Sequence, residues 1–366
     1  MNILILGGTG AMGKYLVDIL SADENNKIYV TSRKKYKNNN NVIFLCGNAR
    51  DNVFLNEILN KEKYDAIVDF MIYNELEFKE KIEKFLKSTS QYIFLSSSRV
   101  YADTKIIKEN SPRLLEVSKD LEYLKTNEYA LSKARQENIL RESQYKNWTI
   151  IRPYITYSDE RLQLGIFEKE QWLFRALRGK SIVFFKDIAE KKTTLTYGKN
   201  VAFGISELIN NKGSLAKAIH ITINESIYWR DVLKIYLDVL EKEMGKKVKV
   251  CLLDDSTYYQ NNLNKYQVKY DRLYNRIFDN NLITELSKDS IIYTPIEEGL
   301  KKCLTDFLRY KKKFREIDWL YEGYADKVTG EKTKLLEICG LKNKIKYLVG
   351  RYFLRLYSLI KKINRR

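Results

Sequence analysis

The sequence predicts an α/β fold built on a doubly wound parallel sheet, and three observations lead to this prediction. Short apolar runs alternate with helical patterns along the first half of the chain. Several glycines follow the first run, Ile3 to Leu6, and a helical pattern starts directly after them. The chain of 366 residues is 44% hydrophobic and 31% charged, which is typical of a globular protein with a sizeable core.

The first turn of the chain predicts a dinucleotide site. Glycines between a strand and a helix let the backbone approach a pyrophosphate, and the first amides of the helix then point at its negative charge. This strand, turn and helix order is that of a Rossmann-type domain. The expected contacts come from Gly7, Gly10, Ala11, Met12 and Gly13.

The next segments continue the alternation of strands and helices. Ligands of such sheets bind beyond the carboxyl ends of the strands, so Gly7 and Ser96 should lie along one edge. The predicted strands cover residues 27–31, 42–46, 66–70 and 92–96, and helical patterns cover 54–59, 75–87 and 127–140.

The end of the second strand bears on the choice of cofactor. A site for NAD usually carries Asp or Glu there, whereas this chain has Ser32 and Arg33. Because a guanidinium can bind a 2′-phosphate, Arg33 slightly favours NADP over NAD. A solvated basic loop is the alternative interpretation.

Two polar groups downstream suit redox chemistry on an alcohol. Ser96, Ser97 and Ser98 end the fifth strand, and Tyr129 and Lys133 share a helix face because they are four residues apart. A phenol has a reference pKa of about 10, and a nearby ammonium favours its phenolate. Such a pair can take a proton from a sugar hydroxyl while a hydride leaves the same carbon.

Together these elements resemble the extended short-chain dehydrogenase/reductase superfamily, the NAD-dependent epimerase/dehydratase family of nucleotide-sugar enzymes. Its G-x-x-G-x-x-G and Y-x-x-x-K motifs are present, and its catalytic Ser lies four residues before the Tyr of a Val-Tyr pair, here Tyr101. The resemblance implies Tyr129, Lys133 and Ser97 as catalytic residues, with Ser98 as the fallback. It implies further cofactor contacts from Ser32, Arg33, Asn48, Ala49, Phe70, Lys133 and Pro153.

Further segments at 151–157, 197–202 and 295–299 extend the resemblance over residues 1 to about 308. It implies a Rossmann domain at 1–153 plus about 197–224. A smaller α/β substrate domain would take about 154–196 and 225–308, and 309–366 would form a helical basic extension. The implied substrate contacts are Ser98, Tyr154, Arg161 and Arg175, the two arginines as candidates for a diphosphate. Taken alone, each arginine is more often a surface residue than a ligand contact.

One departure from the family bears on the reaction. The 4,6-dehydratases carry Thr-Asp-Glu where this chain has Ser97-Ser98-Arg99, so dehydration is disfavoured. The resemblance then implies NAD(P)-dependent epimerisation or ketone reduction of a nucleotide-linked sugar, or of a lipid-linked one, in surface polysaccharide or glycoconjugate biosynthesis. The alternative is a non-catalytic dinucleotide-binding scaffold or an RNA-associated member of the superfamily.

The carboxyl-terminal tail is unusually basic. The net charge is +18, and residues 331–366 hold eleven Lys or Arg against two Glu. Residues 342–366 predict one basic amphipathic helix that lies on an anionic membrane or docks on its own domain or across a dimer. Its apolar stripe consists of Ile345, Leu348, Val349, Tyr352, Leu356, Leu359 and Ile363.

The remaining expectations concern location and partners. His220 is the single histidine and is expected to be a packed, hydrogen-bonded residue rather than a catalyst. Four separated cysteines are expected to be reduced core thiols, and neither a metal site, a signal peptide nor a membrane-spanning run is predicted. We expect a cytoplasmic homodimer that binds no nucleic acid, with the tail as a candidate peripheral contact for the inner face of the membrane.

Overall fold

The computed structural model describes residues 1–257, 259 and 264–354. The chain forms two compact units. Unit 1 comprises residues 1–158, 194–226 and 277–296, and unit 2 comprises 159–193, 227–276 and 297–366. Residues 277–296 therefore belong to the unit that holds the glycine turn, and the expected separate extension from residue 309 belongs to unit 2.

Unit 1 is built on one parallel sheet of seven strands in the order β13-β6-β5-β4-β1-β2-β3, so the predicted doubly wound parallel sheet is confirmed. The chain leaves β1 on one side towards β2 and returns on its other side at β4, which makes this a switch point of the topology. The strands are β1 (Asn2–Leu6), β2 (Lys27–Ser32), β3 (Val42–Cys46), β4 (Tyr64–Asp69), β5 (Thr89–Leu95), β6 (Trp148–Pro153) and β13 (Lys217–Ile221).

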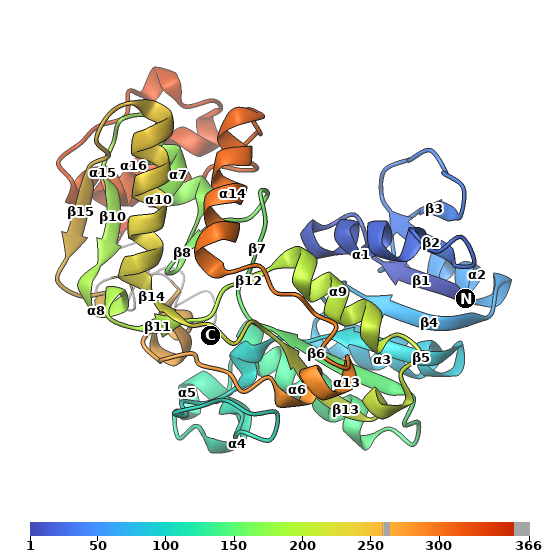
Figure 1. The fold of residues 1–366 in the computed structure, drawn as a ribbon. Helices are drawn as coiled ribbons and strands as arrows, with labels where there is room; N and C mark the ends of the chain where they lie inside the picture. The colour runs from blue at the N-terminus through green and yellow to red at the C-terminus, as the bar shows by residue number, and fades with distance from the viewer. Residues whose placement is uncertain (258, 260–263, 355–366) are drawn as a thin grey trace. The chain divides into compact units, whose positions relative to one another are not determined.

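Helices cover both faces of this sheet (Figure 1). Alternate residues of β1 enter different cores: Ile3 and Ile5 pack with one set of helices, Leu4 and Leu6 with the other. The first set is α1 (Ala11–Ser21), α9 (Gly198–Leu208) and α13 (Asn281–Leu286). The second set is α2 (Asn52–Lys61), α3 (Glu75–Lys87) and α6 (Tyr129–Glu142).

The short elements of unit 1 lie in its connections. A two-stranded parallel pair joins β7 (Thr156–Tyr157) to β12 (Thr196–Tyr197). The short helices are η1 (Ser98–Val100), α4 (Leu114–Val117), α5 (Leu121–Leu124) and η2 (Lys212–Ser214).

A buried carboxylate fixes α6 against the sheet. Glu137 has no exposed surface, and its two oxygens accept hydrogen bonds from Arg152 of β6 at 2.8 and 2.5 Å. The Ser96 hydroxyl donates to it at 2.6 Å and the Arg113 guanidinium at 2.8 Å. Burial by itself raises the pKa of Glu137, but Arg152, Ser96 and Arg113 outweigh it, so this pKa lies below its usual value.

Unit 2 combines short sheets with longer helices. Strands β10 (Ile182–Phe185) and β15 (Val250–Leu253) pair in parallel, while β8 (Gln163–Leu164) with β9 (Phe167–Glu168) and β11 (Lys192–Thr193) with β14 (Ile227–Tyr228) pair antiparallel. Its helices are α7 (Lys169–Leu177), α8 (Lys186–Ala189), α10 (Trp229–Met244), α12 (Lys265–Gln267), η3 (Val268–Arg272), α14 (Ile296–Arg309), α15 (Trp319–Val328), η4 (Leu335–Glu337) and α16 (Leu341–Tyr352). Among these described helices and those of unit 1, none is both long and apolar enough to cross a membrane.

The predicted tail helix corresponds to α16 over residues 341–352, and residues 355–366 of that prediction lie outside the described residues. One face of α16 is buried through Tyr347 and Gly350. A Cβ at Gly350 would lie 2.0 Å from the Leu320 carbonyl oxygen of α15, so the close approach of the two helices requires glycine there. The described part of the tail is thus docked on its own unit.

The cysteines differ from the expectation. All four are free, but only Cys303 is buried, whereas Cys46 and Cys339 are exposed. Both exposed cysteines lie at or beyond the end of an element, where a small apolar side chain is not needed for packing.

His220 is a packed residue of β13, as expected. It is fully buried, with Nε2 2.6 Å from the Asp279 carbonyl oxygen and Nδ1 3.3 Å from the Tyr101 hydroxyl. The carbonyl can only accept, so Nε2 carries the proton and the tyrosine donates to Nδ1. Burial lowers the pKa of His220 to about 4, against the opposing effect of Asp279.

We predict that replacing Glu137 with Gln destabilises the protein by about 3 kcal/mol, because the buried Arg152 guanidinium loses its counter-charge. Arg113 is half-buried and keeps Glu116 as a partner carboxylate. Urea unfolding of the full chain measures this. Glu142→Gln at the exposed end of the same helix is the control and should change the free energy of unfolding by less than about 0.5 kcal/mol. Equal effects of the two substitutions would contradict the assignment of Glu137 as the anchor of α6.

The single histidine offers a direct pH test. An exposed histidine titrates near pH 6.5, whereas the pKa of His220 lies at about 4. The folded state therefore resists the proton that the unfolded state accepts, so this contribution to stability is present above pH 6.5 and is lost as the pH falls towards 4. The imidazole NMR signals should stay those of the neutral ring at pH values well below 6.5, and a midpoint near 6.5 would disprove the assignment.

Candidate functional site

The glycine turn after β1 brings the backbone of the turn into close contact with the backbone at the start of α1. Gly7 adopts a positive φ of 71°, and its amide donates to the Thr31 hydroxyl at 2.9 Å. A Cβ at Gly13 would lie 2.5 Å from the Gly8 carbonyl oxygen, so the first turn of α1 can pack here only with glycine. The chain therefore turns from strand to helix in the smallest available space.

The amino terminus of α1 suits a phosphate. Its N-cap is Gly10, no side chain caps the helix, and no acidic residue lies in its first turn. Ala11 and Met12 are only partly buried. A diphosphate would thus meet helix amides with no competing side-chain carboxylate from that first turn. The residues present fit a dinucleotide.

The predicted contacts to the rest of the dinucleotide come from the neighbouring strand ends. At the end of β2, the Ser32 hydroxyl accepts from the Lys34 amide at 3.1 Å, and Arg33 is exposed. After β3, Asn48 is exposed and Ala49 is buried. The remaining two predicted residues, Phe70 directly after β4 and Pro153 at the end of β6, are partly buried.

Tyr129 and Lys133 occupy the first two turns of α6. Tyr129 is 37% exposed, whereas Lys133 is 2% exposed. The Lys133 ammonium donates to the Leu95 carbonyl at the end of β5, at 2.8 Å, and lies 4.4 Å from the centre of the Phe94 ring. The sheet therefore holds the ammonium in place, and the phenol one helical turn earlier is accessible.

Asp69 supplies the opposite charge for Lys133. Burial lowers the pKa of Lys133 to about 8, while Asp69 and Glu137 act to raise it. Burial also raises the pKa of Asp69 to about 6, against hydrogen bonds from the Met71 amide and the Tyr92 hydroxyl. At neutral pH the lysine keeps its proton. Asp69 was not predicted as its charge partner.

The three serines after β5 differ in what they bind. Ser96 donates to Glu137, and Ser98 is fully buried and donates to the Arg152 carbonyl at 2.7 Å. Ser97 caps η1, where its hydroxyl oxygen accepts from the Arg99 amide at 3.2 Å, so its own hydrogen can still be donated elsewhere. Ser97 suits the catalytic position better than the fallback Ser98, because Ser98 is buried and its hydroxyl hydrogen is already donated inside the fold, which also disfavours the substrate contact predicted for Ser98.

Sequence reasoning missed the role of Arg99. Its guanidinium pairs with Glu128 and lies 5.5 Å from the centre of the Tyr129 ring. Glu128 in turn accepts from the Ala130 amide at 2.7 Å and caps α6. Arg99 thus links the serine turn to the start of the tyrosine helix. The only signal in the sequence was the basic residue at the position of a dehydratase acid.

Tyr154, a predicted substrate contact, is 1% exposed, and its ring lies 5.3 Å from that of Phe278. It packs inside unit 1 instead of presenting a surface to a ligand. The segment that contains Phe278 returns to this unit late in the chain, and for that reason the sequence did not reveal the contact.

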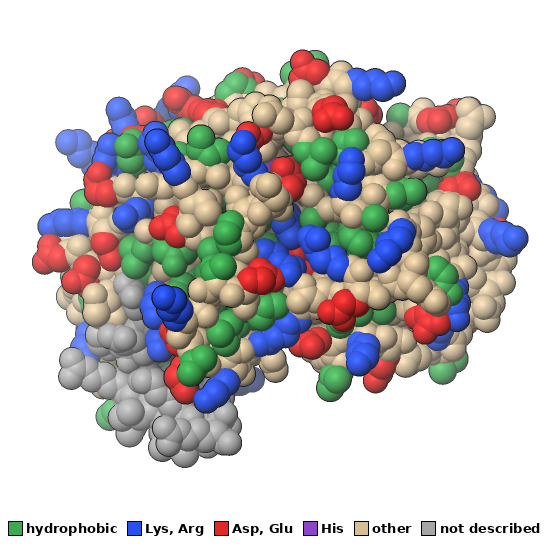
Figure 2. All heavy atoms as spheres, turned by 90° about the horizontal axis from the view of Figure 1, so that it is seen from below, with side chains coloured by type: hydrophobic (Ala, Val, Ile, Leu, Met, Phe, Trp, Pro, Cys, Tyr) green, Lys and Arg blue, Asp and Glu red, His purple; other side chains and the backbone are tan. Residues whose placement is uncertain are grey.

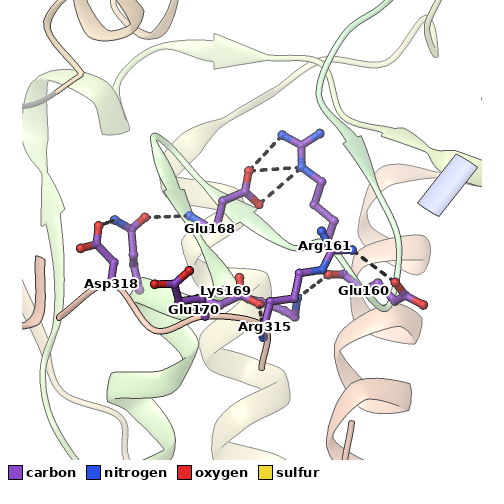
Figure 3. Close-up of a pocket in the computed structure, with 9 residues that line it drawn as sticks. Glu160, Arg161, Glu168, Lys169, Glu170, Arg315 and Asp318 are labelled. Carbon is purple, nitrogen blue, oxygen red and sulfur yellow. Dashed lines mark hydrogen bonds and ion pairs between the residues drawn. The ribbon is translucent and has the colours of Figure 1, made fainter. Parts of the chain in front are cut away.

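Arg161 lies in unit 2 beside a pocket of about 450 Å³. Figure 3 shows its guanidinium pointing at Glu168, to which it donates at 2.9 Å. The pocket lining is mostly acidic, with five carboxylates against three cations, which opposes the binding of a diphosphate. The lining residues are Glu160, Arg161, Glu168, Lys169, Glu170, Gln171, Arg315, Glu316 and Asp318.

The diphosphate contact predicted for Arg175 is wrong. Arg175 has no exposed surface, and its guanidinium is bound to Glu322 at 3.1 Å and to Asp326 at 2.9 Å. A third carboxylate, Glu331, lies at 2.7 Å. This arginine ties α7 to α15 and cannot reach a ligand without breaking a buried network.

Comparison with known proteins agrees with this geometry. The model of the NAD dependent epimerase/dehydratase family matches residues 3–222. A curated relative, the dTDP-D-glucose 4,6-dehydratase of Dictyostelium discoideum, is 28% identical over 180 residues, and the match spans 41% of this chain and 41% of that protein.

Solved structures of similar fold match this chain over nearly the whole of their own length. The dTDP-glucose 4,6-dehydratase of Bacillus anthracis with NAD is 17% identical, with a TM-score of 0.64, and the match covers 85% of this chain and 97% of the relative. The UDP-glucuronic acid 4-epimerase of Bacillus cereus with NAD is 16% identical, with a TM-score of 0.64 and 86% and 100% coverage.

A third structure is the UDP-N-acetylglucosamine 4-epimerase of Methanobrevibacter ruminantium in complex with UDP-N-acetylmuramic acid, at 20% identity, a TM-score of 0.64 and 84% and 98% coverage. At these identities the likeness establishes the fold, and the family model supplies the membership. The chain belongs to the NAD dependent epimerase/dehydratase family.

Proposed function

We propose that the protein is an enzyme that epimerises a nucleotide-linked sugar, or reduces its ketone form, by hydride transfer with NAD or NADP. The observation that carries this proposal is the pairing of an accessible phenol, Tyr129, with the buried ammonium of Lys133 one helical turn later. Both belong to the unit whose first turn suits a dinucleotide. The named relatives act on, or are bound to, nucleotide sugars, which supports this class of substrate.

Each residue has a distinct part in the proposed reaction. When bound, the dinucleotide would accept a hydride from the sugar carbon and return it. Tyr129 would take the proton of the sugar hydroxyl, because its phenol is the accessible group of the pair. Lys133 would favour the phenolate and hold the cofactor ribose, and Ser97 would donate a hydrogen bond to the reacting oxygen.

Arg99 argues against a dehydratase, although the family and the Dictyostelium relative include that activity. Elimination of water needs a carboxylic acid and a carboxylate close to the sugar. The chain instead places a guanidinium, already paired with Glu128, at the position of the second acid. A guanidinium does not release its proton in this pH range, so it cannot act as the acid.

NAD is the preferred cofactor, because three of the similar structures were solved with it. The preference for NADP rests on Arg33 alone, whose exposed side chain lies after β2. Lipid linkage of the sugar and a place in surface polysaccharide or glycoconjugate synthesis are hypotheses that rest on the basic tail.

A non-catalytic scaffold is the second candidate function. The buried Lys133 speaks against it, since burying an ammonium is costly and a protein that only binds a dinucleotide has no need of an accessible phenol beside it. The experiment below separates the two candidates.

We predict that Tyr129→Phe lowers turnover of UDP- or dTDP-linked sugars at least about 100-fold, because only the hydroxyl that moves the proton is lost. The ring and its contact with Arg99 remain, so NAD binding measured by calorimetry should stay unchanged. Product analysis of the wild-type protein should show an epimer or a reduced sugar rather than a 4-keto-6-deoxy sugar.

Tyr310→Phe is a matched control, since this tyrosine is 73% exposed on unit 2. It should leave turnover as it is. Wild-type protein that binds NAD but exchanges no hydride with any nucleotide sugar would favour the scaffold, and turnover by Tyr129→Phe would remove the proposed role of the phenol.

Native mass spectrometry tests the cofactor. We expect one retained NAD per chain, because an epimerase needs its dinucleotide again in the second half-reaction. Arg33→Ala should leave the NAD affinity unchanged. The preference would reverse in favour of NADP under two observations together. The parent protein would bind NADP more tightly than NAD, and Arg33→Ala would weaken NADP binding about tenfold.

A further inference from the structure

Helix α16 buries one face against α15. Tyr347 and Gly350 are the buried residues of α16, and they lie three apart on one face. The Gly350 contact with the Leu320 carbonyl brings the two backbones together. Because only the face that carries Gly350 allows this close approach, α16 can pack on α15 through that face alone.

A polar contact fixes the rotation of α16 as well. The Tyr347 hydroxyl donates to Asp326 at 2.9 Å and accepts from the Thr333 amide at 3.0 Å. Asp326 also binds Lys180 at 2.7 Å and Arg175 at 2.9 Å. Turning α16 about its axis would break both hydrogen bonds of Tyr347 and leave the buried Thr333 amide without its acceptor.

The opposite face of α16 presents large apolar side chains to the surface. Leu341 is 74% exposed, Ile345 53% and Tyr352 57%. Steps of four and seven residues place these three on one stripe, because the helix turns by about 100° per residue. Leu336, in the preceding turn η4, is 93% exposed. A folded protein rarely leaves such side chains together on its surface without a partner.

Lysines flank this stripe on both sides. Lys342 is exposed, Lys344 is half-buried, and they lie on opposite sides of the line through Leu341 and Ile345. Residues 332–354 contain six Lys or Arg and a single acidic residue, Glu337. On the face drawn in Figure 2, basic and acidic side chains are interspersed.

We propose that this basic apolar face, formed by Leu341, Ile345 and Tyr352 with Lys342 and Lys344, binds the surface of an anionic lipid bilayer. Apolar side chains would enter the boundary between headgroups and acyl chains, and the lysines would meet the lipid phosphates. Self-association through the same face would bring like charges together in a two-fold pair, which disfavours a second copy as the occupant. The proposal does not depend on the reaction proposed above.

The test uses full-length protein and sedimentation with vesicles of phosphatidylcholine, with or without phosphatidylglycerol. We expect at least about tenfold tighter binding to the anionic vesicles, falling as salt is added. Ile345→Ser with Tyr352→Ser should weaken this binding about tenfold, and Lys342→Glu with Lys344→Glu should do the same. Turnover in solution and the circular dichroism spectrum should not change.

Val53→Ser with Leu121→Ser is the matched control, since both residues are exposed apolar side chains of unit 1, at 77% and 68%. It should leave vesicle binding unchanged. The proposal fails if both kinds of vesicle are bound equally, or if the α16 variants bind as well as the parent. It also fails if the Ile345 and Tyr352 variant turns a dimer into a monomer in analytical ultracentrifugation, because a second copy would then cover the face.

Discussion

The buried carboxylate of Glu137 sets the position of everything that α6 contributes. It joins this helix to β5 through Ser96 and to β6 through Arg152. Exposure then rises along one helix face towards the amino terminus, from 0% at Glu137 through 2% at Lys133 to 37% at Tyr129. Because Glu137, Lys133 and Tyr129 are spaced four residues apart, they share one helix face, with the buried anchor at one end and the accessible phenol at the other.

The ammonium of Lys133 depends on the same frame. Burial alone would drive both Lys133 and Asp69 towards their neutral forms, and each charge limits that change in the other. With a pKa of about 8 for the lysine, the cation persists at neutral pH in a place almost closed to water. A charge held there acts on its neighbours through protein rather than through solvent, so its influence on a phenol one turn away is larger than at a surface.

The sequence predicted the sheet and the Tyr129 and Lys133 pair because their signals are local. Continuous apolar runs, a glycine turn and a spacing of four residues can each be recognised within a short window. Local signals could not predict the role of Arg175, because its partners Glu322 and Asp326 lie 147 and 151 residues further along the chain. Whether an arginine awaits a ligand or completes a buried network is decided by such distant partners. The same limit hid the contacts of Tyr154 and the anchoring role of Glu137.

The tail illustrates the limit in another form. Its periodicity predicted a helix whose apolar stripe would lie on an anionic membrane or dock on its own domain or across a dimer. The most deeply buried residues of α16 are Tyr347 and Gly350, which lie outside that stripe, and of the stripe Leu348 packs against Trp319 and Ile338. Gly350 allows two backbones to touch, and the Tyr347 hydroxyl donates to a buried carboxylate, which an aliphatic side chain could not do. Close approach and hydrogen bonding together outweighed the burial of Ile345 and Tyr352, which stay at the surface. An apolar stripe therefore identifies a helix that needs a partner, and the partner need not be the rest of its own chain.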